Sequence, residues 1–224
     1  MNSLALKSIR IGGFIFTLFI WNMVLSRKLD QTTLVLILVI PVLLVFPVVR
    51  TARIITERQP SPGGLAWTTS ALHIILMIFF GAAVSASVRI FNFWSDGILA
   101  LPPAVGLVLL YITGFLLALT VLNLAVNGLG APFAIALSRR VASRWLYAYT
   151  RNPMVLFTLA VLVSAGLYYQ SLVYICWVLL LVTPAFIYFL KVYEEHELER
   201  RFGESYTMYK AKTPFLIPRK QEPN

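Results

Sequence analysis

Acidic residues are scarce in this chain of 224 residues, which has nine of them against nineteen lysines and arginines. Only Asp30, Glu57 and Asp96 precede residue 194, and five of the nine lie between Glu194 and Glu204. Charged residues make up 12% of the sequence and hydrophobic residues 59%. Soluble domains are about a quarter charged, so this scarcity of charge excludes an ordinary soluble domain.

Cysteine and histidine are also rare. Cys176 is the single cysteine, which excludes an intramolecular disulfide and a cysteine-cluster metal site. His73 and His196 are the two histidines, so we predict no metal site. His73 lies inside a long apolar run, where an ionisable side chain raises a functional question. We interpret it as a neutral histidine hydrogen-bonded to a neighbouring helix, because its own and the adjacent apolar runs contain no acidic partner for a proton relay.

Long apolar runs are abundant. A helix needs about 20 predominantly apolar residues to cross a bilayer, and several runs approach or reach that length. We predict six spans, at 9–26, 32–50, 66–90, 99–124, 153–169 and 172–193. The predicted fold is therefore all-α: a polytopic membrane helix bundle that ends in a helical hairpin and a cytosolic C-terminal helix.

Basic residues lie mainly before the first span, after the second, after the fourth and in the tail. They are Lys7, Arg10, Arg50, Arg53, Arg58, Arg139, Arg140, Arg144, Arg151, Arg200, Arg201, Lys210, Lys212, Arg219 and Lys220. The positive-inside rule then places both termini in the cytoplasm, and segment 125–152 on the same side as the acidic cluster. We interpret the net charge of +10 as basic loops that face anionic membrane lipids, and we predict no nucleic-acid binding.

Three sequence patterns lie on that side of the membrane. The first is G-L-G-A-P-F from Gly128, and the second is R-N-P-M from Arg151. The third runs from Glu194 to Pro218 and reads E-E-x-x-L-x-x-x-F-G-x-x-Y-x-x-Y-x-x-x-x-P-x-x-I-P. Composition alone indicates an interfacial segment followed by a solvated helix end. The fixed order of the three patterns indicates a more specific function.

Together these patterns resemble the isoprenylcysteine carboxyl methyltransferase family, which belongs to the same broad group as the phospholipid N-methyltransferases. The resemblance implies an integral membrane enzyme that binds S-adenosylmethionine on the cytoplasmic side. Its substrate would be a lipid-like or prenylated acceptor that enters from the bilayer. Residues 1–124 would then form an N-terminal transmembrane bundle, and residues 125–224 the cofactor-binding and catalytic region. Two alternatives stay open: an NADPH-dependent membrane reductase related to sterol reductases, and a non-enzymatic membrane protein.

The resemblance also assigns residues to the cofactor pocket. They are Gly128, Gly130, Pro132, Tyr149, Arg151, Asn152, Pro153, Glu194, Glu195 and Tyr206. The predicted catalytic residues are Arg144, Arg151 and Glu194, because arginine positions a carboxylate acceptor, whereas a glutamate takes a proton from an amine. The choice between these acceptors stays open. We predict that Glu197 and Glu199 are helix-surface partners of nearby arginines, as in an i,i+4 pair between Glu197 and Arg201.

Overall fold

A computed structural model of the protein describes residues 3–58, 61–91, 99, 101–128, 138 and 140–218, with side chains from residue 8 onward. Every regular element in these ranges is helical. The α-helices are α1 (Ser3–Ser26), α2 (Gln31–Arg58), α3 (Pro62–Phe91), α4 (Pro103–Asn123), α5 (Pro153–Tyr168), α6 (Leu172–Trp177), α7 (Thr183–Phe189), α8 (Glu195–Phe202) and α9 (Glu204–Lys212).

Within the described residues, five helical stretches are long and apolar enough to cross a membrane. They are Ser8–Ser26, Gln31–Arg58, Pro62–Phe91, Pro103–Gly128 and Leu172–Phe202. Helix α5 is apolar but shorter, at 16 residues. Each stretch coincides with a predicted span, and the all-α membrane bundle with its C-terminal hairpin is confirmed. The division after residue 124 and the cytosolic location of the last helix stay predictions.

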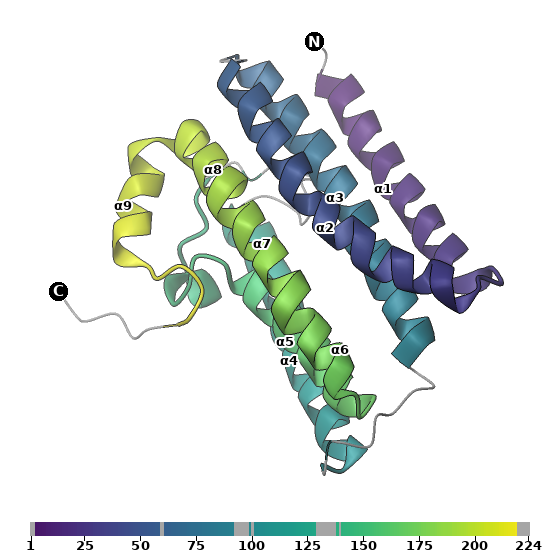
Figure 1. The fold of residues 1–224 in the computed structure, drawn as a ribbon. Coiled ribbons are helices and arrows are strands. Elements are labelled where there is room, and N and C mark those ends of the chain that lie inside the picture. Colours follow the sequence, from purple (N-terminus) through teal and green to yellow (C-terminus); the bar gives the residue numbers. More distant parts are fainter. Residues whose placement is uncertain are drawn as a thin grey trace.

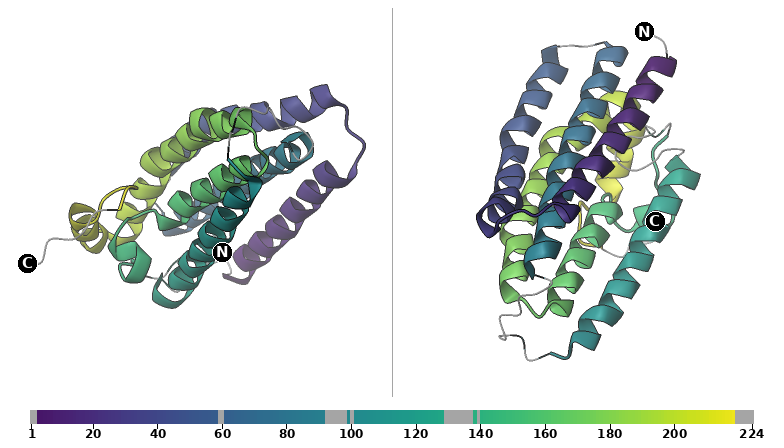
Figure 2. Two further views of the ribbon diagram at one scale, coloured as in Figure 1. Left: turned by 90° about the horizontal axis from the view of Figure 1, so that it is seen from below. Right: turned by 90° about the vertical axis from the view of Figure 1, so that its right-hand side faces the viewer.

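Helix α3 packs against both α1 and α2, and α4 forms an antiparallel hairpin with α5. The long helix that contains α6, α7 and α8 lies against α2 and α5 (Figures 1 and 2). Figure 1 shows the N-terminus, the end of α2, the start of α3 and α8 toward one end of the bundle. The orientation of the two termini relative to the cytoplasm stays a prediction.

The last long helix, Leu172–Phe202, contains two π-helical turns, at Val178–Val182 and Leu190–Glu194. Pro184 accounts for the first, because a proline has no N–H to donate to the carbonyl four residues earlier. The Thr183 backbone N–H and hydroxyl both donate to the Val178 carbonyl oxygen, the hydroxyl at 2.9 Å. In an α-helix, side chains four residues apart rotate gradually around the helix axis. Each wider π-helical turn reverses part of this rotation, which helps to keep such side chains on one face of the helix.

Helices α4 and α5 approach closely at Gly106. A Cβ at this position would lie 2.6 Å from the carbonyl carbon of Leu167 and would also overlap the backbone of Tyr168. Backbone atoms cannot rotate away, so we expect Gly106→Ala to lower the free energy of unfolding by about 1–3 kcal/mol. Gly114→Ala, also on α4, is the control, because a Cβ there has no atom within 4 Å. Thermal unfolding in detergent compares the two variants, and equal melting temperatures would contradict the prediction.

Candidate functional site

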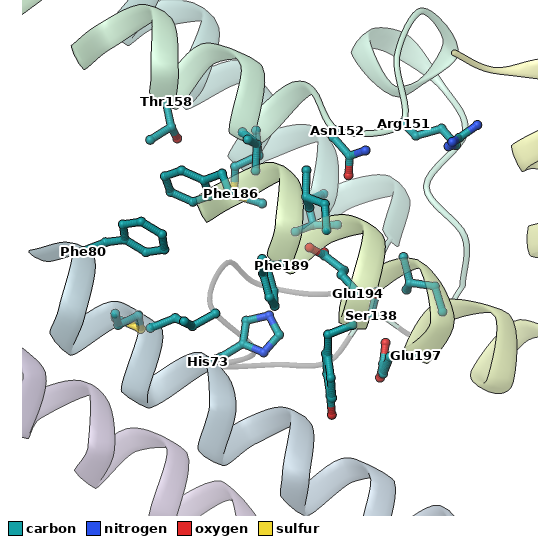
Figure 3. A pocket seen from close by; sticks show the side chains of 18 of the residues that line it. His73, Phe80, Ser138, Arg151, Asn152, Thr158, Phe186, Phe189, Glu194 and Glu197 are labelled. Carbon is teal, nitrogen blue, oxygen red and sulfur yellow. The ribbon is translucent and has the colours of Figure 1, made fainter. Parts of the chain in front are cut away.

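A cavity of about 410 Å³ lies between α3, α5 and the last long helix, within the range of small-molecule sites, roughly 300–1,000 Å³. One part of its lining is polar and includes Thr69, Ser138, Arg140, Tyr147, Arg151, Asn152, Glu194, Glu197, Arg201, Tyr206 and Tyr209. The other part is apolar and includes Trp21, Leu76, Met77, Phe80, Val84, Leu162, Trp177, Phe186 and Phe189. Figure 3 shows Phe80 and Phe186 together, away from Glu194 and Glu197. The cavity is therefore amphipathic.

The cavity is also long. Its lining residues on α3 run from Thr69 to Ser85, about 24 Å at a rise of 1.5 Å per residue. Phe80 and Phe186 stack with ring centroids 4.1 Å apart and join α3 to α7 in the apolar part. An elongated shape with a polar end suits a molecule that has a headgroup and a hydrocarbon tail.

Arg151 joins three parts of the chain. Its Nε and Nη2 donate to Glu195 Oε1 at 3.0 and 2.7 Å, and its Nη1 donates to the carbonyl oxygens of Lys210 and Thr213 at 2.8 and 2.7 Å. Glu195 is only 7% exposed, and its other oxygen lies 2.9 Å from the Lys210 ammonium. Two predicted site residues, Arg151 and Glu195, are thus brought together, and each is paired within the protein.

The residues beside Arg151 hold the C-terminal segment. The Arg151 backbone N–H donates to the Pro214 carbonyl at 2.9 Å. The Asn152 side-chain amide and the Thr150 hydroxyl both donate to the Phe215 carbonyl, at 2.8 and 3.3 Å. The Lys191 ammonium lies 5.2 Å from the centre of the Phe215 ring. The R-N-P pattern and Pro214 of the third pattern therefore contact each other.

Two glutamates of the last helix line the cavity. Glu197 is 3% exposed, lies 2.7 Å from Arg201 Nη1 and accepts a long hydrogen bond of 3.5 Å from the Thr69 hydroxyl. The predicted pairing with Arg201 is confirmed, but the prediction that Glu197 lies on the helix surface is wrong, because α8 faces α3 here. Within the described part of the chain, Glu194 makes no hydrogen bond or ion pair. Glu194 is thus a carboxylate in the cavity without a donor.

Three tyrosines complete the polar part of the cavity. The Tyr209 hydroxyl donates to the Tyr147 carbonyl at 2.7 Å, and the rings of Tyr206 and Tyr209 lie 6.1 Å apart. Burial raises the pKa of all three phenols, and the carboxylates of Glu195 and Glu194 add to the effect at Tyr206. The phenols are therefore uncharged at neutral pH and present hydroxyls and aromatic faces.

Some of the predicted residues do not line the cavity. Arg144 and Tyr149 are exposed, and 54% of the surface of Tyr149 is accessible to solvent. Gly128, Pro153 and Glu195 are buried without lining the cavity, and Pro153 is the first residue of α5. The predicted residues that do line it are Arg151, Asn152, Glu194 and Tyr206. The predicted positions Gly130 and Pro132 lie outside the described residues.

Sequence reasoning missed the contribution of α3. His73 lines the cavity, and its Nδ1 lies 2.8 Å from the Thr69 carbonyl oxygen of its own helix. The predicted hydrogen bond to a neighbouring helix is therefore wrong. A signal for this wall is present in the sequence: Thr69 and His73 are four residues apart in an otherwise apolar run, so they share one helix face.

The apolar helices and the cavity indicate a multi-pass helical membrane protein with an amphipathic cavity. The model of the phospholipid methyltransferase family matches residues 102–205, which contain α4, α5 and the last long helix. The match agrees with the resemblance seen in the sequence patterns and suggests that this region is a membrane methyltransferase domain. Helices α1–α3 lie outside the matched residues. No curated protein and no solved structure matches the chain.

Proposed function

We propose that the protein transfers a methyl group from S-adenosylmethionine to the amine of a lipid-like acceptor at the cytoplasmic membrane face. The observation that carries this proposal is that Glu194, at the polar end of an amphipathic cavity and within the family-matched residues, has no hydrogen-bond or ion-pair partner among the described residues. The apolar part extends along membrane-spanning helices, which supports an acceptor that enters from the bilayer.

The polar part of the cavity fits the methyl donor. When bound, S-adenosylmethionine supplies a methyl group carried on a cationic sulfonium. Tyr147, Tyr206 and Tyr209 offer uncharged aromatic rings, whose faces attract cations, and Glu194 offers carboxyl oxygens that accept hydrogen bonds. Asn152 adds a side-chain carbonyl oxygen, because its amide donates elsewhere.

The charges in the cavity favour an amine over a carboxylate as the acceptor. Each described arginine of the lining already donates to protein: Arg151 to Glu195, Arg201 to Glu197 and Ser138, and Arg140 to the carbonyl of Asn127. A carboxylate acceptor would meet Glu194 without an uncommitted arginine to hold it. An ammonium headgroup instead pairs with Glu194, which takes the proton that an amine must lose before it attacks.

The same arginine contacts weigh against a nicotinamide reductase. NADPH brings several phosphate charges, which proteins usually hold with arginine or lysine side chains. In the described part of the cavity the arginines are engaged with protein acceptors. The methyltransferase is therefore the better supported of the two enzymes.

Ligand binding tests the proposal. We expect purified protein in mild detergent to bind S-adenosylmethionine and its demethylated product in isothermal titration calorimetry, and to release such a molecule in mass spectrometry of the purified sample. NADPH is the comparison ligand. Binding of NADPH without binding of S-adenosylmethionine would favour the reductase, and folded protein that binds neither would contradict any enzymatic role for this cavity.

A further inference from the structure

His73 lies on α3, outside the family-matched residues, yet its side chain lines the cavity. Along this face of α3 it stands between Thr69, near Glu197, and Met77 in the apolar part. Figure 3 shows the imidazole at the same end of the cavity as Glu194, each on a different helix. His73 is thus placed at the transition from the polar to the apolar lining, where the headgroup of a lipid-like molecule joins its tail.

Two contacts fix the imidazole ring. Its Nδ1 lies 2.8 Å from the Thr69 carbonyl oxygen, and its edge meets the Phe189 ring at 85°, with centroids 5.4 Å apart. A carbonyl oxygen has no proton to give, so Nδ1 carries the hydrogen. In the neutral imidazole, Nε2 then holds a lone pair and acts as a hydrogen-bond acceptor.

This Nε2 has no hydrogen-bond partner within the described residues. It is also not enclosed by protein atoms, unlike the partnerless Nε2 of His196. The polar groups nearby satisfy one another: the Thr69 hydroxyl lies 3.0 Å from the Tyr193 hydroxyl, and Glu197 pairs with Arg201. The lone pair of His73 is therefore open to the cavity.

In the described part of the cavity, two acceptors consequently have no donor: His73 Nε2 and the Glu194 carboxylate. An acceptor that leaves water without gaining a donor is costly, so a ligand that fills this space must bring hydrogen-bond donors. A primary or secondary ammonium brings at least two N–H groups, which matches two acceptors. A quaternary ammonium has the same charge and brings none.

We infer that His73 Nε2 accepts a hydrogen bond from the headgroup of the acceptor and selects lipid-like amines that still carry an N–H group. The inference rests on the proposed methyl transfer and adds a specificity-determining residue from the N-terminal helices. A fully methylated headgroup lacks this hydrogen bond and binds more weakly, so the same contact favours release of the final product.

Two probes with one tail and one charge test the inference. Dodecylamine carries N–H donors at neutral pH, and dodecyltrimethylammonium carries none. Because one hydrogen bond to an otherwise unsatisfied group is worth roughly a factor of ten, we expect the parent protein to bind dodecylamine about tenfold more tightly. Native mass spectrometry of the protein in detergent micelles measures both dissociation constants. A parent protein that binds the two probes equally overturns the inference, whatever any variant does.

Two substitutions separate recognition by Nε2 from a structural role of Nδ1. His73→Asn keeps a donor near the Nδ1 position but has no atom at Nε2, whereas His73→Gln places an amide oxygen near Nε2 and loses the Nδ1 position. We expect the asparagine variant to lose the tenfold preference and the glutamine variant to retain most of it. Loss in both variants, or loss in the glutamine variant alone, overturns the assignment to Nε2.

A separate measurement distinguishes this inference from the proposed function. Titration with S-adenosylmethionine reports on the polar pocket. We expect neither His73 variant to change the dissociation constant for S-adenosylmethionine by more than about twofold, which corresponds to roughly 0.4 kcal/mol. A parent protein that prefers dodecylamine but does not bind S-adenosylmethionine retains the amine selection and contradicts methyl transfer.

Discussion

Glu194→Gln is expected to lower kcat for methyl transfer to an amine by about 10²–10⁴-fold, the range typical of losing a general base. Glutamine keeps the size of the side chain but cannot take a proton. Glu194 suits this role because it lines the cavity without a partner in the described chain, whereas Glu195 is bound by Arg151 and Lys210. Transfer of labelled methyl from S-adenosylmethionine to phosphatidylethanolamine in mixed micelles measures the effect.

The matched control for this prediction is Glu199→Gln. Glu199 lies on the same helix, its side chain is 39% exposed and it contacts Lys210 at 2.8 Å. We expect the kcat of the Glu199→Gln variant to stay within about threefold of the parent value, because a surface ion pair contributes only about 0–1 kcal/mol to stability. Equal kcat values for the two variants would show that Glu194 does not act as the base.

Arg151→Gln is expected to destabilise the protein by about 3 kcal/mol, toward the lower end of the range for breaking a buried ion pair. The substitution removes the arginine from Glu195 and leaves the carbonyls of Lys210 and Thr213 without their donor. Lys210 still contacts Glu195 and limits the loss. Thermal unfolding in detergent measures the change, and limited proteolysis should cut the segment after α9 more quickly.

The control is Arg144→Gln, in the same connection between α4 and α5. The Arg144 side chain is exposed, and among the described residues Arg144 forms hydrogen bonds only through its backbone carbonyl, which accepts from Asn123 and Tyr147. Its removal is expected to change the melting temperature by less than about 2 °C, because surface substitutions usually stay within ±0.5 kcal/mol. Identical unfolding of the two variants would contradict the bridging role of Arg151.

Hydropathy was sufficient to predict the long apolar helices, because a membrane span needs a long apolar run whatever it packs against. The sequence patterns also predicted that Arg151 and Glu195 belong to one site, and the two side chains do meet, at 2.7 Å. What hydropathy does not contain is the direction of each side chain around its helix. Glu197 looked solvated for this reason, although it faces α3.

The connection before α5 shows a second limit. The resemblance assigned Tyr149 to the cofactor pocket, but the chain forms a 3-10 turn at Trp145–Ala148 that buries Tyr147 and leaves Tyr149 outside. The turn begins with Trp145 at a φ of 54°, a conformation that large side chains rarely adopt. Nothing in the local sequence favours such a backbone conformation. Which of the two tyrosines is buried therefore depends on the tertiary structure.

The two walls of the cavity come from different parts of the chain. The family-matched part supplies Glu194 and the start of α5, while α3, outside the match, supplies His73 and Phe80. Substitutions on the α3 face can therefore change which molecule is accepted without altering the residues proposed to hold the methyl donor. Such an arrangement would let a lineage of these proteins acquire new substrates by mutation of a single helix, with the chemistry inherited intact.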